Sequence, residues 1–216
     1  MIKFRASSIS EIMTDPKGKG EILSVGAKTF IEYMAKEFVY GFREEISSKY
    51  LEKGVLVEPQ SIDLRNDVFF TDYQKNTERR ENDWITGECD IFTGSGIIDV
   101  KSSWSLATFP ATRIKAAKDA EKAGYDWQLR AYMLLWDVDC AEVNYCMVNT
   151  PDELIGYEDV SLHYVDHIDP SLRVTRVLYE RNFDMESKIK EKVEAARAYF
   201  DLMTEMIAND HAEEQS

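Results

Sequence analysis

The sequence has 216 residues, of which 44% are hydrophobic and 12% aromatic, a composition that indicates one globular domain and excludes a disordered chain. Its 40 acidic residues outnumber 26 basic ones, and the net charge of −14 argues against a protein that coats DNA through bulk electrostatics. No segment approaches the roughly 20 apolar residues of a membrane-spanning helix. We therefore expect a soluble intracellular protein with a single domain over residues 1–216, in which the polar residues 209–216 form a frayed tail.

The first predicted elements are helices. Ser8 is followed three residues later by Glu11, a spacing that resembles a capping box and predicts a short helix over Ser7–Met13. Apolar residues at helical spacing predict a second helix from Ala27 and a third over Ser47–Leu64.

The middle of the chain has β-type patterns, after which helical spacing returns. The predicted strands and helices are, in order, strands Phe69–Tyr73, Asp83–Phe92 and Ile97–Ser102, helix Tyr125–Trp136, strands Glu142–Val148 and Arg173–Tyr179, and a long helix from Asp184. The last helix carries apolar residues in steps of four and three from Met185 to Ile207. This stripe is typical of core packing, and an oligomer interface is the alternative.

The three cysteines, Cys89, Cys140 and Cys146, are odd in number and include no Cys-x-x-Cys pair. Neither a disulfide framework nor a zinc or iron–sulfur site is therefore expected. We predict three buried, reduced thiols.

Glu58 occupies an apolar stripe of the third predicted helix. The other members of the stripe are Leu51, Val55 and Ile62. The spacing places the Glu58 carboxylate on the inward face, where it costs stability unless a partner or a ligand neutralises it. Gly54, one turn earlier, would let another element or a ligand approach. A glutamate that reaches solvent along the helix surface is the alternative, and Pro59 is expected to bend or end the helix.

A glycine-rich turn, Thr93–Gly96, lies between two predicted strands and predicts a β-hairpin. If Phe92 pairs with Ile97, Asp90 lies directly opposite Asp99. Cβ atoms of such partners are about 5 Å apart, and like charges at that distance are destabilising, so the pair favours a cation between them.

The alternation of side chains along the second hairpin strand places Lys101 on the same face as Asp99, while Ile98 and Val100 face apolar packing on the other side. Carboxylate oxygens suit Mg²⁺ or Mn²⁺, which activate water and stabilise a departing oxyanion at a phosphate. Lys101 would stabilise developing charge and orient or help to deprotonate the attacking water. A purely structural salt bridge between Asp99 and Lys101 is the alternative.

Four segments in order carry a family resemblance: Gly54-x-x-x-Glu58, Gly87-Glu88-Cys89-Asp90, Ile98-Asp99-Val100-Lys101 and Gln128-x-x-x-Tyr132. They resemble the PD-(D/E)xK nucleases of the lambda-exonuclease and YqaJ-like viral recombinase group over most of residues 5–148. The sequence departs from the pattern in having Cys89 in place of proline and an aspartate as the third carboxylate. The resemblance implies an α/β, restriction-endonuclease-like core of helix, three-stranded meander, helix and strand, with additional flanking helices.

The resemblance also implies the site. One or two Mg²⁺ ions, for which Mn²⁺ substitutes, would be held by Asp90, Asp99 and the Val100 carbonyl with Glu58 nearby, and Lys101 would be the catalytic lysine. Gln128 and Tyr132 would lie beside the site, ordering the metal-bound water or contacting DNA. Ser7 and Ser8 lie in a segment similar to the one that contacts a 5'-phosphate in such enzymes.

By the same resemblance the activity would be a 5'-to-3' exonuclease on linear double-stranded DNA. It would generate single-stranded tails for phage-type recombination in the cytoplasm of a bacterial or phage-infected cell. A single-strand annealing protein and a ring-shaped homotrimer are the implied partners. Basic residues that precede the Gln128 helix, namely Arg113, Lys115, Lys118 and Lys122, are expected to contact DNA phosphates. Trp104 and Phe109 are expected to be core residues, with stacking on a frayed base as the alternative.

Three alternatives remain. A RecB-like nuclease that processes single-stranded ends has the same motifs, although its iron–sulfur subgroup needs four cysteines. A non-catalytic DNA- or protein-binding module would keep the fold, but it would have no physical need for four costly polar groups. A metal site at His163 and His167 is the third; we expect both histidines on the solvated surface.

Overall fold

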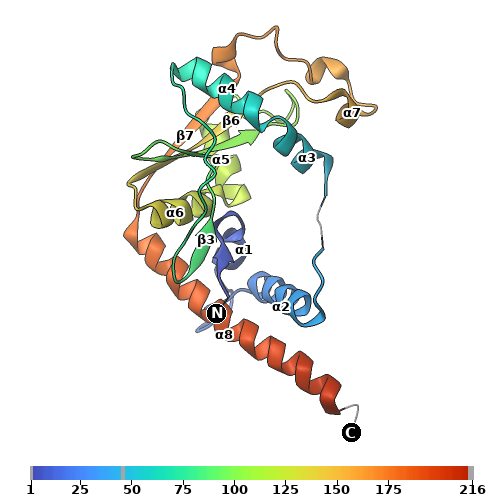
Figure 1. Ribbon diagram of the computed structural model, residues 1–216, viewed down its shortest axis with the longest axis vertical. Helices are drawn as coiled ribbons and strands as arrows, with labels where there is room; N and C mark the ends of the chain where they lie inside the picture. The colour runs from blue at the N-terminus through green and yellow to red at the C-terminus, as the bar shows by residue number, and fades with distance from the viewer. Residues whose placement is uncertain (1, 45–46, 214–216) are drawn as a thin grey trace.

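The computed structural model describes residues 2–44 and 47–213, and a four-stranded sheet in the order β4-β5-β6-β7 forms its centre (Figure 1). The strands are β4 (Ile91–Phe92), β5 (Ile97–Ser102), β6 (Cys140–Cys146) and β7 (Val174–Glu180). β5 and β6 run parallel, whereas the β4–β5 and β6–β7 pairs are antiparallel. The predicted strands that correspond to β5, β6 and β7 are therefore confirmed to within two residues.

The parallel pair requires a long connection, which two helices provide. These are α5 (Arg113–Ala123) and α6 (Tyr125–Trp136), and the bounds of α6 are those predicted. Gly124 joins them with a φ of 74°, a left-handed conformation that glycine adopts without strain. The chain therefore passes from α5 into α6 through this single residue.

Helices cover both faces of the central sheet. On one face, Ile62 and Leu64 of α4 (Glu58–Phe69) pack with Ile98 and Val100, as predicted for these two strand residues. Alternate positions of β5 and β6 point the opposite way, into a larger core that includes α6. Asp99 and Lys101 therefore lie on the α6 side of the sheet.

A second, smaller sheet contains β1 (Phe4–Arg5), β2 (Arg80–Glu81) and β3 (Ile85–Gly87) in the order β1-β3-β2. The predicted strand Asp83–Phe92 is thus divided between two sheets. Residues 88–90 separate β3 from β4. At this point the Val100 amide of β5 donates a hydrogen bond to Asp90 Oδ2 at 2.7 Å, and not to a backbone carbonyl of a neighbouring strand.

The long helix α8 (Phe183–Glu213) runs beside α2 (Val25–Tyr40) in the lower part of Figure 1. The middle of its predicted stripe is buried, from Ile189 to Phe200, which confirms core packing. Of the tail predicted over 209–216, residues up to Glu213 are helical, and residues 214–216 lie outside the described residues.

The remaining elements are short: η1 (Ala6–Ser8), α1 (Ser10–Met13), α3 (Lys49–Leu56), α7 (Asp152–Ile155), η2 (Val160–Leu162) and η3 (Pro170–Leu172). Ser8 does not cap α1; its hydroxyl donates to the Arg5 carbonyl instead. Within the described residues, no helix is long and apolar enough to cross a membrane.

The third predicted helix is divided into two, as the bend or end expected at Pro59 allowed. Val57, with a ψ of 9°, separates α3 from α4, and Pro59 lies in the first turn of α4. The stripe consequently breaks: Leu51 and Val55 are 55% and 75% exposed, whereas Ile62 is buried. A Cβ added to Gly54 would meet nothing within 4 Å, so this glycine does not serve a close approach within the described chain.

Two smaller predictions were also wrong. The segment predicted as strand Phe69–Tyr73 instead ends α4, with Phe70 in the left-handed region at a φ of 54°. Cys89 and Cys146 are buried free thiols, but Cys140, the first residue of β6, is exposed.

Candidate active site

Asp90 and Asp99 meet across the β4–β5 hairpin. Phe92 pairs with Ile97, as predicted, and Ile91 with Ile98, so the next step of the register brings the two aspartates opposite each other. The turn between the strands is fixed by the Thr93 hydroxyl, which accepts a hydrogen bond from the Gly96 amide at 3.0 Å. The local sequence thus sets the spacing of the two carboxylates.

Asp99 is the most deeply buried member of the site, with 1% of its surface exposed. Its Oδ1 accepts a hydrogen bond from Gln128 Nε2 at 3.0 Å, and its Oδ2 lies 2.8 Å from Lys101 Nζ. Lys101 Nζ also lies 4.7 Å from the centre of the Tyr125 ring. The carboxylate of Asp99 therefore joins β5 to α6.

The crowding of charge shifts two pKa values. Burial, together with the neighbouring Asp99 carboxylate, raises the pKa of Asp90 to about 7. Burial alone would lower the pKa of Lys101, but the carboxylates of Asp99 and Asp90 outweigh it and raise that pKa well above its ordinary value. Near neutral pH the site accordingly holds a protonated lysine beside a carboxyl group that binds a proton unusually readily.

A cavity of about 250 Å³ opens beside these groups. Its lining includes Asp90, Lys101, Gln128 and Tyr132 of the predicted set, and Ser7 from η1 at the N-terminus. Four residues to which the sequence assigned no role also line it: Arg5, two residues before Ser7, and Arg79, Thr86 and Glu88. Glu88 lies in the Gly-Glu-Cys-Asp motif, but Arg79 has no local sequence signal.

Gly87 allows α6 to approach this cavity. A Cβ there would lie 2.9 Å from both Ala6 Cβ and Tyr132 Cε1 and 3.1 Å from Leu135 Cδ1. Real Cβ atoms essentially never make contacts of 2.9 Å, so any larger residue here would force the neighbouring side chains to shift. The resulting position of Tyr132 lets its hydroxyl accept a hydrogen bond from Gln128 Nε2 at 3.2 Å.

Glu58 lies apart from the cavity lining. It begins α4, is half-buried and forms an ion pair with Lys75. Its charge still contributes to the raised pKa of Asp90, so the two carboxylates are electrostatic neighbours. Glu58 therefore lies in the first turn of α4, and not on the inward face of a continuous helix as the stripe predicted.

Oxygen atoms that suit a divalent ion are present, but not as a three-carboxylate cluster. Among the described residues, no three His, Cys, Asp or Glu side chains come close enough together to hold an ion. Asp90 and Asp99 are the adjacent pair, and Val100 lies between Asp99 and Lys101 in β5. Mg²⁺ is commonly bound by one or two carboxylates, with water and substrate phosphate completing its shell, so these residues fit such an ion.

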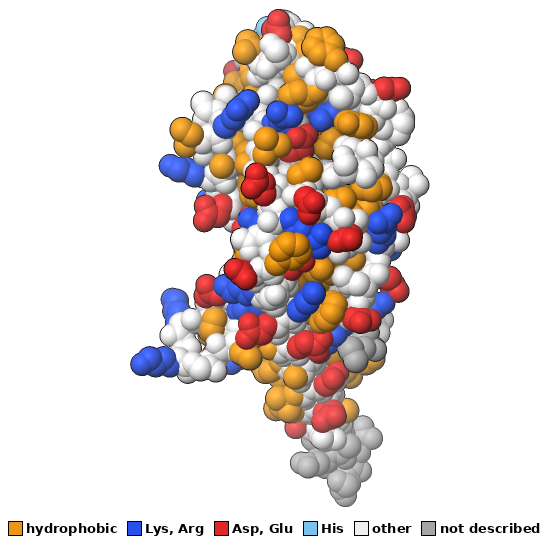
Figure 2. All heavy atoms as spheres, turned by 90° about the vertical axis from the view of Figure 1, so that its left-hand side faces the viewer, with side chains coloured by type: hydrophobic (Ala, Val, Ile, Leu, Met, Phe, Trp, Pro, Cys, Tyr) orange, Lys and Arg blue, Asp and Glu red, His pale blue; other side chains and the backbone are white. Residues whose placement is uncertain are grey.

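Other predicted DNA contacts do not line the cavity. Ser8 is engaged with the Arg5 carbonyl, and the four basic residues of α5 are exposed on that helix. Lys115 forms an ion pair with Asp119, and Arg113 borders a different hollow beside β7. Acidic and basic side chains are interspersed over the face seen in Figure 2, so the net charge of −14 does not make this face uniformly negative.

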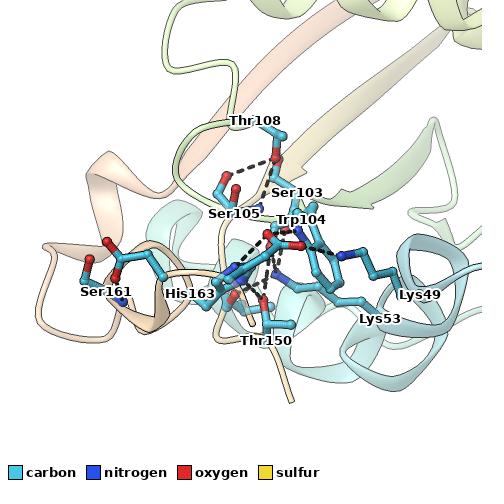
Figure 3. Close-up of polar contacts among 12 residues, drawn as sticks. Lys49, Lys53, Ser103, Trp104, Ser105, Thr108, Thr150, Ser161 and His163 are labelled. Atoms are coloured by element: carbon cyan, nitrogen blue, oxygen red, sulfur yellow. Dashed lines mark hydrogen bonds and ion pairs between the residues drawn. The ribbon is translucent and has the colours of Figure 1, made fainter. Parts of the chain in front are cut away.

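A polar network joins the segments that follow β5 and β6 (Figure 3). Lys53 of α3 is fully buried, and its Nζ donates to the carbonyl oxygens of Ser103 at 2.6 Å, Trp104 at 3.0 Å and Val148 at 3.1 Å. Burial lowers the pKa of Lys53 to about 8. Trp104 is buried and held in this network, which confirms its expected core position, whereas Phe109 is only partly buried and packs against the main core.

His163 belongs to the same network. Its ring is fully buried, 2.9 Å from Thr150 Oγ1 and 3.2 Å from the Glu158 carboxylate. The prediction of a solvated His163 was wrong, because the segment that follows β6 folds back over the end of the sheet. His167 is exposed, as predicted.

Comparison with solved structures identifies relatives of this fold. A phage related exonuclease from Haemophilus somnus 129PT is 39% identical, with a TM-score of 0.89 over 95% of this chain and 96% of that one. An alkaline exonuclease, LHK-Exo, from Laribacter hongkongensis has the same fold at 13% identity, with a TM-score of 0.69 over 98% of this chain and 94% of that one. LHK-Exo has also been solved in complex with dAMP, and that structure gives a TM-score of 0.65 at 15% identity, over 98% of this chain and 94% of that one.

No protein-family model matches the sequence, and neither does any curated protein. The structural relatives nevertheless confirm the restriction-endonuclease-like α/β fold and the lambda-exonuclease and YqaJ-like resemblance of the motifs. On the identity and coverage of the Haemophilus relative, the chain belongs to the family of phage-related exonucleases.

Proposed function

We propose that the protein is a Mg²⁺-dependent exonuclease that degrades linear double-stranded DNA from 5' to 3', with Mn²⁺ as a substitute metal. The observation that carries the proposal is that Asp90, Lys101 and Gln128 line one cavity, while the buried Asp99 contacts both Lys101 and Gln128. DNA as the substrate is supported by the family and by the dAMP complex of LHK-Exo.

Asp90, Asp99 and the Val100 carbonyl would hold one or two Mg²⁺ ions, with Glu58 nearby. The raised pKa of Asp90 supports this role, because two crowded carboxylates favour a cation between them. When bound, the metal supplies a water of lowered pKa and stabilises charge on the phosphate oxygens.

Lys101 acts as a fixed positive charge. Its neighbouring carboxylates keep it protonated, so it stabilises negative charge that develops on the scissile phosphate.

Gln128 and Tyr132 position the other groups. The Gln128 amide donates to Asp99 Oδ1 and so fixes the orientation of the carboxylate. The same amide donates to the Tyr132 hydroxyl, which leaves the hydroxyl hydrogen free to donate to a DNA phosphate.

Arg5 and Ser7 would bind the 5'-phosphate of the strand being cut. Both line the cavity, and the positive charges of Arg5 and Arg79 face the same space as Lys101. Ser8 is a weaker candidate than the motif implied, because its hydroxyl is already bonded to the Arg5 carbonyl. Exposed cations of α5, including Arg113, Lys115 and Lys118, are proposed as contacts farther along the duplex.

The test uses one duplex labelled at either the 5' or the 3' end, incubated with Mg²⁺ and compared with circular and single-stranded DNA. We expect early release of the 5' label, no cutting of the circle and faster degradation with a 5'-phosphate than with a 5'-hydroxyl. Early release of the 3' label would overturn the polarity, and preference for single strands would favour the RecB-like alternative. A wild-type protein inert toward all of these substrates would support the non-catalytic alternative.

We further propose that the single-stranded tails feed phage-type recombination with a single-strand annealing protein, and that the protein acts in the cytoplasm as a homo-oligomeric ring. Support for self-association comes from α3, where Leu51, Val55 and Leu56 are exposed and the first two lie one helical turn apart. Light scattering is expected to give the mass of a trimer. A monomer at every concentration tested would argue against the ring.

A further inference from the structure

A second cavity, of about 560 Å³, lies between α4 and residues 148–173. It shares no lining residue with the active-site cavity. Pro170 of η3 also lines it, and η3 contacts α4 at the top of Figure 1. Its floor includes the buried side chains of Val57, Leu64 and Val148. We call it the α4 cavity; it combines an apolar floor with a charged rim.

Asp63 and Asp67 form the α4 side of the rim. They lie one helical turn apart and both are exposed. Within the described residues, neither side chain has a hydrogen bond or an ion pair. Like charges at this spacing destabilise a helix. Two unpaired carboxylates beside an apolar floor therefore favour a cationic ligand.

The opposite side of the cavity is also acidic but already paired. Asp166 accepts from Arg173 Nη1 at 2.9 Å and from Asn149 at 2.7 Å, and Asp152 accepts from the Tyr164 hydroxyl. Arg173 is the one basic side chain among the lining residues. The rim thus carries four carboxylates and one guanidinium, and this excess of negative charge disfavours the binding of nucleic-acid phosphates.

Arg173 does not neutralise the α4 side of the rim. Its side chain is 10% exposed and is already bonded to Asp166, which leaves Asp63 and Asp67 unpaired. A ligand that pairs with these carboxylates and also covers the apolar floor must carry cationic and apolar groups together, and a polypeptide segment supplies both kinds of side chain.

We propose that the α4 cavity docks a cationic, partly apolar polypeptide segment of another protein. Lysine or arginine side chains of the segment pair with Asp63 and Asp67, and an apolar side chain covers Val57 and Leu64. This docking is independent of the nuclease reaction, because none of these residues lies in the active-site cavity.

The test measures fluorescence anisotropy of a labelled peptide of about 12 residues built from lysine and leucine, at about 150 mM salt to screen long-range attraction. The double variant Asp63→Asn, Asp67→Asn is expected to weaken binding about tenfold. The matched control is Asp201→Asn, Glu205→Gln, which removes the same charge from an exposed pair at the same spacing on α8. The control is expected to bind within about twofold of the wild type.

Three results would overturn the proposal: no binding of the probe by the wild type, equal weakening by the two double variants, or equal affinity for a peptide of lysine and serine. A change of oligomeric state in the Asp63→Asn, Asp67→Asn variant would also overturn it, since a second copy of the chain would then be the occupant. The nuclease rate of this variant is expected to be unchanged. If the wild-type chain does not cut DNA, the proposed function is refuted, but the docking result is unaffected.

Discussion

Substituting Gly87 by alanine perturbs the contact between β3, η1 and α6 without touching any charged group. The added Cβ would stand 2.9 Å from atoms of Ala6 and Tyr132, whereas ordinary carbon contacts begin near 3.4 Å. Several atoms must therefore move by about half an ångström. Overpacking of this kind typically costs about 1–3 kcal/mol, which lowers the melting temperature of a chain this long by about 2–12 °C.

The same substitution is expected to slow DNA cutting. Tyr132 is bonded to Gln128, and Gln128 orients Asp99, so a displaced tyrosine disturbs the carboxylate that is proposed to hold metal. Disturbing such a supporting contact typically costs about 10- to 100-fold in activity. Calorimetry and single-turnover cleavage of an end-labelled duplex measure the two effects.

Gly54→Ala is the matched control. Gly54 lies inside α3, and an added Cβ meets nothing within 4 Å, so alanine should stabilise the helix by about 0.5–1 kcal/mol and leave cleavage unchanged. The two substitutions thus have opposite expected signs. A Gly87→Ala protein that melts and cuts like the wild type would refute the packing argument.

Three further predictions concern the polar groups. Lys53→Met leaves three carbonyl oxygens without their donor and is expected to cost about 2–4 kcal/mol by denaturant unfolding. Lys49→Met, one turn earlier at a partly exposed ion pair, should destabilise the protein clearly less, and equal losses would contradict the buried network. Because the pKa of Asp90 is raised to about 7, the metal-free folded state binds more protons than the unfolded state between about pH 4 and 7. Its unfolding free energy should therefore fall with rising pH in that window relative to Asp90→Asn, and parallel curves would contradict this. Gln128→Ala removes the donor to Asp99 Oδ1 and should reduce Mg²⁺ affinity, measured by calorimetry, about 10- to 100-fold, so unchanged affinity would exclude the positioning role.

The hairpin at the active site was predictable because its information is local. The glycine-rich turn fixed one register, and the two-residue alternation of β5 then placed Asp99 and Lys101 on one face and Ile98 on the other. The same locality explains the correct bounds of α6. Nothing beyond the turn and the strand pattern was needed for these residues.

The helix before the hairpin shows the opposite case. The stripe through Leu51, Val55 and Glu58 assumed an unbroken helix, but the backbone turns at Val57 and changes which face points inward. Pro59 signalled the break without giving the new direction of α4. The buried member of α3 proved to be Lys53, whose three carbonyl partners lie 50 residues or more away in sequence.

Contacts between distant segments were beyond the local patterns. Arg79 reaches the cavity because β2 pairs with β3, and His163 is buried because its segment folds over the ends of β5 and β6. Neither residue has a neighbouring sequence signal that distinguishes it from a surface position. The fold itself had to be known to place them.

The most direct test of the account is single-turnover cleavage of a linear duplex by Asp99→Asn and Lys101→Met proteins that retain the wild-type melting curve. With Mg²⁺ the wild type should cut, and both variants should cut at least about 100-fold more slowly. Chelation of the metal should abolish cutting by the wild type, and added Mg²⁺ should restore it. Variants that cut at the wild-type rate, or cutting that persists under chelation, would contradict the assignment of this site.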